Sequence, residues 1–210
     1  RDLDPGLTAN NFEGFVNGQT LLFNQGTNRV DGPDDNVQVA AGAQLTAGPN
    51  GSIMLIAGRN ALSAGNLTAT GGNVGIVAAT DTTIDVGQSG FVRLVSASAT
   101  TRGGGRVAVA TGGVLSADNG SVQIVAHAIG EDISVAGLEN ATVQVQGRNG
   151  GQGSVEIVAS GSGSLAAVRG GTVDVSATDA ASRAGTINMN ARTVQVDSFD
   201  SGEGFIGSSL

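Results

Sequence analysis

The hydrophobic residues of this chain recur in short phrases that follow a glycine. Each phrase is a glycine, a small or polar residue, and then two aliphatic residues separated by one other residue, as in Gly120–Ile124. Because successive side chains of a strand point to opposite faces, the two aliphatic residues share one face. We therefore expect Val122 and Ile124 to point into a core and Gln123 to point outward. Copies of the phrase begin at Gly51, Gly72, Gly90, Gly105, Gly120, Gly153, Gly171 and Gly185.

The spacing of these glycines indicates a solenoid. Successive differences are 21, 18, 15, 15, 33, 18 and 14 residues, and a degenerate copy at 142–145 divides the longest interval. This period is shorter than that of a propeller blade or a helical repeat. One strand cannot bury its apolar face alone, whereas stacked coils bury a continuous core. The pattern predicts an all-β, right-handed parallel β-helix of nine or ten coils, on the order of 45 Å long.

Other features set the expected boundaries of the solenoid. We expect coils over residues 36–197, a cap or flanking segment over 1–35, and a tail or partial cap over 198–210.

A second set of aliphatic clusters predicts another sheet of the same prism. Its members are Leu45, Leu67, Ile84 with Val86, Val114 with Leu115, Ile133 with Val135, Leu165, and Val194 with Val196.

A further apolar residue follows several of the inward pairs and has two possible roles. If the strand bends at a corner here, which is the interpretation that we favour, the residue reaches the core of its own coil. If the alternation continues, the residues form an outward stripe that could dock a partner, a neighbouring rod or a hairpin outside the coils. The stripe would consist of Ile56, Val77, Val95, Val125 and Val158.

Composition narrows the classes of function. Aromatic residues make up 3% of the chain and the ten cationic residues are all Arg, with a formal net charge of −8. Acidic chains with scattered Arg do not favour nucleic acid, so we expect no nucleic-acid partner. No apolar run approaches the roughly 20 residues that span a membrane. The chain lacks Cys, so we expect no disulfide and no thiolate metal site. It begins at Arg1 instead of Met, so we expect a mature or excised part of a longer protein.

Candidate catalytic and metal-binding residues are sparse. The acidic residues are spread thinly, and most fall in predicted turns, where Asp caps backbone groups. Asp197, Asp200 and Glu203 are the sharpest candidates for Ca²⁺, which prefers several oxygen ligands. His127 is the single His and has no Ser or Cys partner nearby in the sequence, which makes it a weak catalytic candidate. We expect no enzyme activity and no cofactor.

The stretch from Phe15 to about Val95 resembles the haemagglutination-activity region of filamentous-haemagglutinin-like, two-partner-secretion exoproteins. The phrases that carry the resemblance include 15–18, 23–27, 51–57 and 64–78. Residues 105–196 look like the degenerate repeats that follow in such proteins. The resemblance implies a right-handed β-helix, export through a partner outer-membrane transporter, and a role in adhesion at a Gram-negative cell surface. The Asn-Pro-rich secretion signature of these proteins is absent from this sequence.

Three functions remain open from the sequence. The first is a non-enzymatic, adhesin-like rod whose receptor is a protein or a glycan. The second is a structural subunit of an extracellular filament or layer, with neighbouring copies joined end to end through strand edges. The third is a polysaccharide-active β-helix enzyme.

Overall fold

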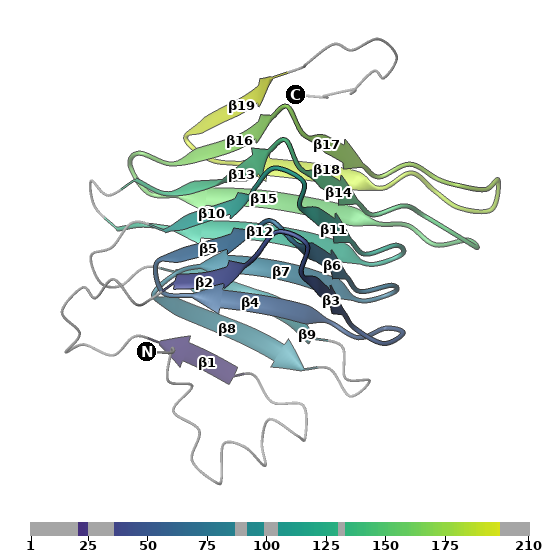
Figure 1. The fold of residues 1–210 in the computed structure, drawn as a ribbon, viewed down its shortest axis with the longest axis horizontal. Helices are drawn as coiled ribbons and strands as arrows, with labels where there is room; N and C mark the ends of the chain where they lie inside the picture. The colour runs from purple at the N-terminus through teal and green to yellow at the C-terminus, as the bar shows by residue number, and fades with distance from the viewer. Residues whose placement is uncertain (1–20, 25–35, 87–91, 99–104, 130–132, 198–210) are drawn as a thin grey trace, which may run out of the picture.

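The protein is an all-β parallel β-helix in which three sheets form the sides of a prism (Figure 1). The computed structural model describes residues 21–24, 36–86, 92–98, 105–129 and 133–197. The strands are short, three to seven residues each, and follow the alternation of aliphatic and polar residues in the sequence. The fold class predicted from the glycine phrases is therefore confirmed.

The three sheets each collect one strand from every coil. Sheet 1 contains β2 (Asn36–Val39), β5 (Asn60–Ser63), β10 (Arg106–Val109), β13 (Val135–Glu139), β16 (Leu165–Arg169) and β19 (Thr193–Asp197). Sheet 2 contains β3 (Gln44–Thr46), β6 (Asn66–Thr68), β11 (Val114–Ser116), β14 (Thr142–Gln144) and β17 (Thr172–Asp174). Sheet 3 contains β4 (Ile53–Ala57), β7 (Asn73–Ala78), β12 (Ser121–His127), β15 (Ser154–Ser160) and β18 (Thr186–Asn190).

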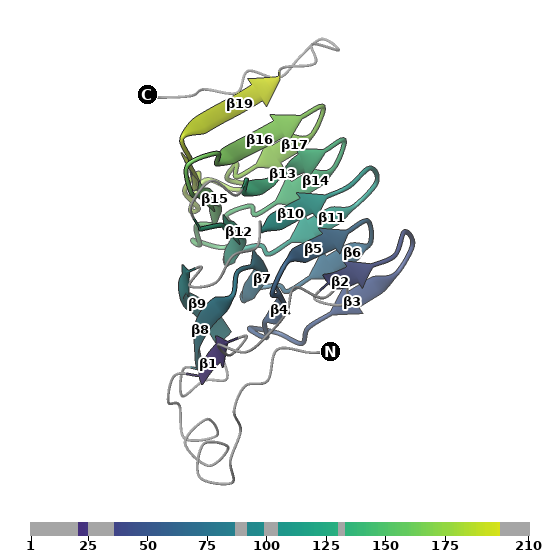
Figure 2. The same ribbon diagram turned by 90° about the vertical axis from the view of Figure 1, so that its left-hand side faces the viewer.

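The chain visits sheets 1, 2 and 3 in turn and then climbs to the next coil. Figures 1 and 2 together show a right-handed path, with sheets 1 and 2 on one side of the prism and sheet 3 on the other. Neighbouring coils pair in parallel and in register, for example Val122 with Val74 below and Val155 above. Like residues therefore stack in rows along the axis.

The solenoid has five complete coils and the first strand of a sixth, which corrects the nine or ten predicted. The glycine phrases do not all belong to one sheet, because Gly105 precedes β10 in sheet 1 and Gly171 precedes β17 in sheet 2. The phrase at Gly90 leads into β9, which lies outside the coils. Six stacked strands of sheet 1 span about 24 Å, roughly half of the predicted length.

The corner between sheets 1 and 2 is made by residues with positive φ. Gly42 (φ 78°), Gly112 (φ 81°), Asn140 (φ 50°) and Gly170 (φ 59°) occupy this corner in different coils. This left-handed region is open to Gly and tolerated by Asn, which explains why these two residue types punctuate the repeats. The corner turns the chain without interrupting the stacking of the strands on either side.

The core is a column of aliphatic side chains inside the prism. The predicted inward pairs are buried, with exposed fractions of 0% for Val122 and Ile124 and at most 1% for Val155 and Ile157. The polar residues between them point outward, and Gln123 Nε2 donates a hydrogen bond to Glu156 Oε2 of the next coil at 3.0 Å. The column is built from Val, Ile, Leu and Ala.

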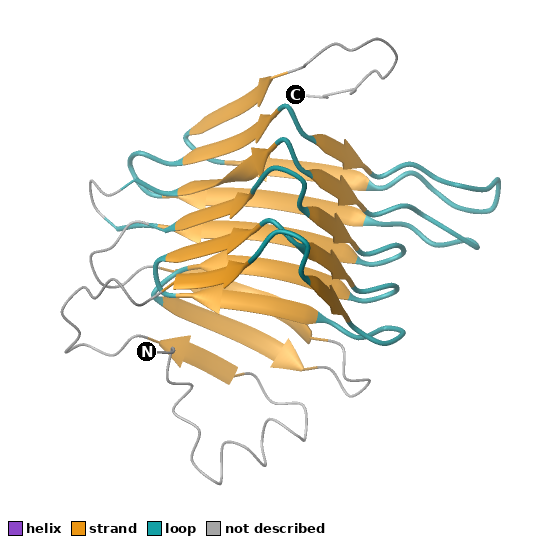
Figure 3. Ribbon diagram, in the orientation of Figure 1, coloured by secondary structure: helices purple, strands orange, loops and turns teal. Residues whose placement is uncertain are grey.

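A three-stranded antiparallel sheet lies beside the coils (Figures 2 and 3). Its strands are β1 (Leu21–Asn24), β8 (Asp81–Val86) and β9 (Val92–Ser98), in the order β1-β8-β9. β8 begins shortly after β7 ends, and β9 leads back toward β10, so this hairpin is an insertion between the second and third coils. We call it the side sheet.

The second aliphatic set divides among three places instead of forming one sheet. Leu45, Leu67 and Leu115 belong to sheet 2, whereas Val135, Leu165, Val194 and Val196 belong to sheet 1 and Ile84 to the side sheet. The coil strands run from Asn36 to Asp197. Most of residues 1–35 and all of residues 198–210 lie outside the described part of the chain.

Candidate functional site

The predicted apolar stripe lies on the outer face of sheet 3. Ile56, Val77, Val125 and Val158 pair in register in successive coils, within strands that continue past them. The corner that we favoured at these positions is therefore absent, and the residues point away from the main core. Val77 and Val125, with exposed fractions of 0% and 4%, form a second apolar cluster with Ala79.

The side sheet covers this second cluster. Leu94 and Ala97, which belong to β9, pack against it together with Met54 and Val158. The outward stripe of sheet 3 thus contacts a hairpin of the same chain. Val95 does not belong to the stripe, because it lies in β9 with 51% of its surface exposed. Its assignment followed from counting the phrase at Gly90 as a coil.

The outer face of sheet 1 carries a shallow hollow with small residues at its floor. One outward row runs along the axis as Leu62, Ala108, Gly137, Ala167 and Gln195. The three central residues are buried, and the larger side chains close the two ends of the row. Only a small side chain fits at the centre, because a Cβ on Gly137 would collide with the backbone of Ala167.

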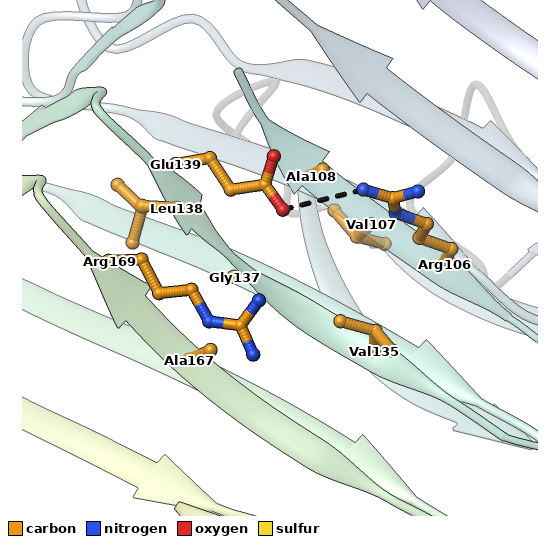
Figure 4. A pocket seen from close by; sticks show the side chains of 9 residues that line it. All are labelled: Arg106, Val107, Ala108, Val135, Gly137, Leu138, Glu139, Ala167 and Arg169. Carbon is orange, nitrogen blue, oxygen red and sulfur yellow. Dashed lines mark hydrogen bonds and ion pairs between the residues drawn. The ribbon is translucent and has the colours of Figure 1, made fainter. Parts of the chain in front are cut away.

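Two arginines and a glutamate border this hollow. Figure 4 shows the side chain of Arg169 extending beside Gly137, with the Arg106–Glu139 pair on the other side. Arg106 Nη2 lies 3.4 Å from Glu139 Oε1, and about half of each side chain is exposed. Arg169 Nη2 donates to Gln195 Oε1 at 2.9 Å. Exposed pairs of this kind contribute about 0–1 kcal/mol to the free energy of unfolding, so they position the side chains more than they stabilise the fold.

These charges reach the hollow from three different coils. Residues 106, 139 and 169 are separated by 33 and 30 positions in the sequence, and only the register of β10, β13 and β16 brings them together. The sequence contains no local motif for this arrangement, and our sequence analysis missed it. Arg106 and Arg169 are two coils apart, which corresponds to about 10 Å along the axis.

His127 has a partner that the sequence did not suggest. It stands opposite Ser160 of the next coil, and the Ser160 hydroxyl contacts His127 Nδ1. Burial lowers the pKa of His127 below its ordinary 6.5, so the imidazole is neutral at neutral pH. Ser134 Oγ donates to the Ser160 carbonyl at 2.6 Å, which links the pair to the residue just before β13. Register stacking is sufficient to explain this contact between polar side chains.

The calcium hypothesis rests on residues that are mostly outside the described part of the chain. Asp197 ends β19 and accepts hydrogen bonds from Gln195 Nε2 at 3.1 and 3.0 Å, whereas Asp200 and Glu203 lie outside the described residues. Within residues 21–24, 36–86, 92–98, 105–129 and 133–197, no three His, Cys, Asp or Glu side chains gather as a metal site.

Two other carboxylates act within turns. Hydrogen bonds from Ser176 hold the pKa of Asp174 below its ordinary value, and the backbone amide of Asn149 does the same for the pKa of Asp179. Asp179 also accepts from the amides of Ala181 and Ser182, as an Asp in a turn commonly does. These hydrogen bonds give the two carboxylates a structural role.

Comparisons with protein-family models, with curated proteins and with solved structures find no significant match to this chain. In the described segments, no helix is long and apolar enough to cross a membrane.

Proposed function

We propose that this chain is a non-enzymatic, adhesin-like segment of a secreted or cell-surface exoprotein. The observation that carries the proposal is the register of the coils, which holds outward side chains in fixed rows along three flat faces. A surface of this kind can meet a protein or glycan receptor without the entropic cost of ordering loops. The hydrophobic core is inside the prism and the side sheet covers part of sheet 3, so the outer faces of sheets 1 and 2 are available for recognition.

The resemblance to filamentous-haemagglutinin-like exoproteins supports the same proposal. It adds export through a partner outer-membrane transporter and a location outside a Gram-negative cell. Those two points rest on the phrases in residues 15–95 and on the β-helix that they imply.

An adhesion assay tests the proposal. Beads coated with the purified chain should bind host or bacterial cells more strongly than beads coated with an unrelated β-helix of similar net charge. Soluble chain should compete with the coated beads, because a specific surface saturates. Equal binding by the two kinds of bead would contradict an adhesin role.

A filament subunit is the second candidate, favoured by the last coil. Ile187, Val194 and Val196 stand in inward rows yet are 39%, 48% and 48% exposed, because within the described residues, which end at 197, no coil stacks above them. Exposed core and open strand edges promote end-to-end pairing. However, β19 stands one coil above β17 and β18 in the climb of the chain. A second copy in the same orientation therefore leaves a gap of one strand between its own β3 and β4 and the strands β17 and β18. Continuous sheets require the copy to turn by about one third of a revolution, and this added constraint ranks the candidate second.

Sedimentation velocity over a range of concentrations separates the two candidates. A filament subunit should form longer species as concentration rises, with an axial repeat of roughly 25–29 Å, between five and six strand spacings, under the electron microscope. A sedimentation coefficient that does not change with concentration would exclude the filament and leave the adhesin proposal standing.

A further inference from the structure

We propose that the hollow on the outer face of sheet 1 is a receptor site for an acidic linear polysaccharide whose uronate carboxylates bind Arg106 and Arg169. The inference rests on the proposed adhesive function and names the ligand class of one face. The hollow is bordered by three coils and combines cationic groups, aliphatic carbon and a floor of small residues.

The two arginines provide the recognition of carboxylate. A guanidinium presents donors in a planar fork that matches a carboxylate in two parallel hydrogen bonds. Arg169 stands in register between Glu139 and Asp197, and its guanidinium donates to the neutral amide of Gln195, a hydrogen bond that does not neutralise its charge. Arg106 is half exposed even within its ion pair, and can exchange one carboxylate for another.

The charge of this face differs from that of the whole chain. Exposed Arg59 precedes β5, so that Arg59, Arg106 and Arg169 accompany two acids, Glu139 and Asp197, on sheet 1 or at its edge. The chain as a whole carries a formal net charge of −8. A locally cationic hollow on an acidic protein directs an anionic ligand to that hollow and away from the other faces.

The shape of the hollow favours a sugar chain over an acidic peptide. Val135 and Leu165 follow Arg106 in one outward row, and the C–H face of a pyranose ring can pack against these two aliphatic side chains. Glu139 and Arg169 stand in a second outward row, nearer the carboxyl ends of the strands. Strands β10, β13 and β16 already pair with each other, so an added peptide strand finds no open backbone partners on this face. The separation of about 10 Å between the coils of Arg106 and Arg169 suits two charged sugars of an extended chain.

Glu139 has a specific role in this arrangement. Its carboxylate occupies the position at Arg106 that a ligand carboxylate would take, and it also repels an anionic ligand. Replacing Glu139 by Gln removes the competing charge and keeps the shape of the side chain. The variant should therefore bind an acidic polysaccharide more tightly than the natural chain, which is an outcome that a damaged fold would not produce.

Titration calorimetry with oligogalacturonate tests the inference. Arg106→Gln and Arg169→Gln should each weaken binding about tenfold, because each loses hydrogen bonds to a charged group. Glu139→Gln should strengthen it severalfold. Arg183→Gln is the matched control, because Arg183 is exposed in the loop before β18 and the substitution changes the net charge equally. Its affinity should equal that of the natural chain.

Three results would overturn the inference: no binding of oligogalacturonate by the natural chain, an equal loss in Arg183→Gln, or equally tight binding of poly-glutamate. A thermal unfolding curve for each variant ensures that a lost site is not a lost fold. The bead assay separates this inference from the broader proposal. If coated beads adhere to cells and oligogalacturonate does not compete, the adhesin proposal survives and the polysaccharide site does not.

Discussion

At the scale of single residues, the corners between sheets 1 and 2 show why Gly and Asn punctuate the sequence. Asn140 has a φ of 50°, and Gly170 takes the equivalent corner of the next coil with a φ of 59°. Asn140 Oδ1 lies close to the position that a Cβ on Gly170 would occupy. The corner therefore combines a conformational demand with tight stacking between coils.

Substitutions at Asn140 test the conformational demand. Asn140→Gly should leave the free energy of unfolding nearly unchanged, because Gly populates positive φ readily. Asn140→Val should lower it by about 1–2 kcal/mol, because a β-branched residue is disfavoured in the left-handed region and lacks the polar side chain with which Asn forms local hydrogen bonds. Urea denaturation of the two variants measures the difference. Equal stability of the Val and Gly variants would show that φ is not the constraint at this corner.

His127 makes stability depend on pH. Burial lowers its pKa in the folded chain below the ordinary 6.5, so the unfolded chain takes up a proton more readily. The stabilising contribution is complete above the unfolded pKa and is lost as pH falls from there toward the folded pKa. Between about pH 8 and about pH 5, the unfolding free energy of the natural chain should therefore fall more than that of His127→Gln.

Denaturant titrations at the two pH values check this prediction. Both chains retain Asp174 and Asp179, whose pKa values are lowered in the folded chain. The stability that these two carboxylates contribute is lost only at a pH below the range of this experiment. Parallel pH profiles for the natural chain and the variant would contradict the assignment to His127.

At the scale of elements, the solenoid depends on each strand having a neighbour above and below. Ile124 lies in β12, between β7 and β15, and is fully buried. Ile187 occupies an inward position in β18, the last strand of sheet 3, and is 39% exposed. The same residue type therefore has very different surroundings at the two positions.

Truncation of these two isoleucines measures how much the stabilisation from a buried side chain falls from the middle of the solenoid to its last coil. Ile124→Ala should lower the free energy of unfolding by about 2–5 kcal/mol, since it leaves a cavity between two coils. Ile187→Ala should cost less than about 1 kcal/mol, because part of its side chain already contacts water. Chemical denaturation gives both values. A similar cost at both positions would mean that another layer covers β18 in solution.

The side sheet should separate from the coils when its apolar contact is made polar. Val125→Asn places an amide beneath β9, at an energetic cost of about 1–3 kcal/mol for the buried polar group. Amide hydrogen exchange should then accelerate in residues 81–98 and stay slow in β12 and β15. Val135→Asn, half-buried on the outer face of sheet 1 and away from the side sheet, is the control and should leave exchange in β8 and β9 unchanged.

The sequence predicts the fold class well but not the coil count, for a reason visible in the strands. Val107 in sheet 1, Val173 in sheet 2 and Val155 in sheet 3 are each the first aliphatic residue of a similar glycine phrase. All three sheets bury one face, so the same alternation serves each of them and does not encode the sheet to which a strand belongs. Counting phrases therefore counts strands from different sheets and also includes β9.

The candidate site was harder to predict from the sequence than the fold was. Arg106, Glu139 and Arg169 meet because β10, β13 and β16 pair with a particular register, which depends on the lengths of the corners and of the hairpin insertion. A shift by one residue would move every side chain of a strand to the opposite face. The contact between His127 and Ser160 arises in the same way.

At the scale of the whole molecule, the chain is a short rigid prism whose sides and ends differ in character. The sides carry rows of polar residues together with the side sheet, whereas the last coil exposes core residues such as Val194 and Val196. Recognition at the sides and association at the ends are therefore separate properties. The proposed function lies at the sides, and it requires that the five coils stack continuously.

The distance between two spin labels on sheet 2 tests this requirement most directly. The chain has no Cys, so Gln44→Cys and Thr172→Cys accept labels at these two positions alone. Both residues are exposed and stand in one outward row, four coil steps apart. Pulsed electron resonance should give one narrow distribution near 20 Å, because four steps span about 19 Å. A distance near 40 Å, or a broad distribution, would contradict the five-coil β-helix.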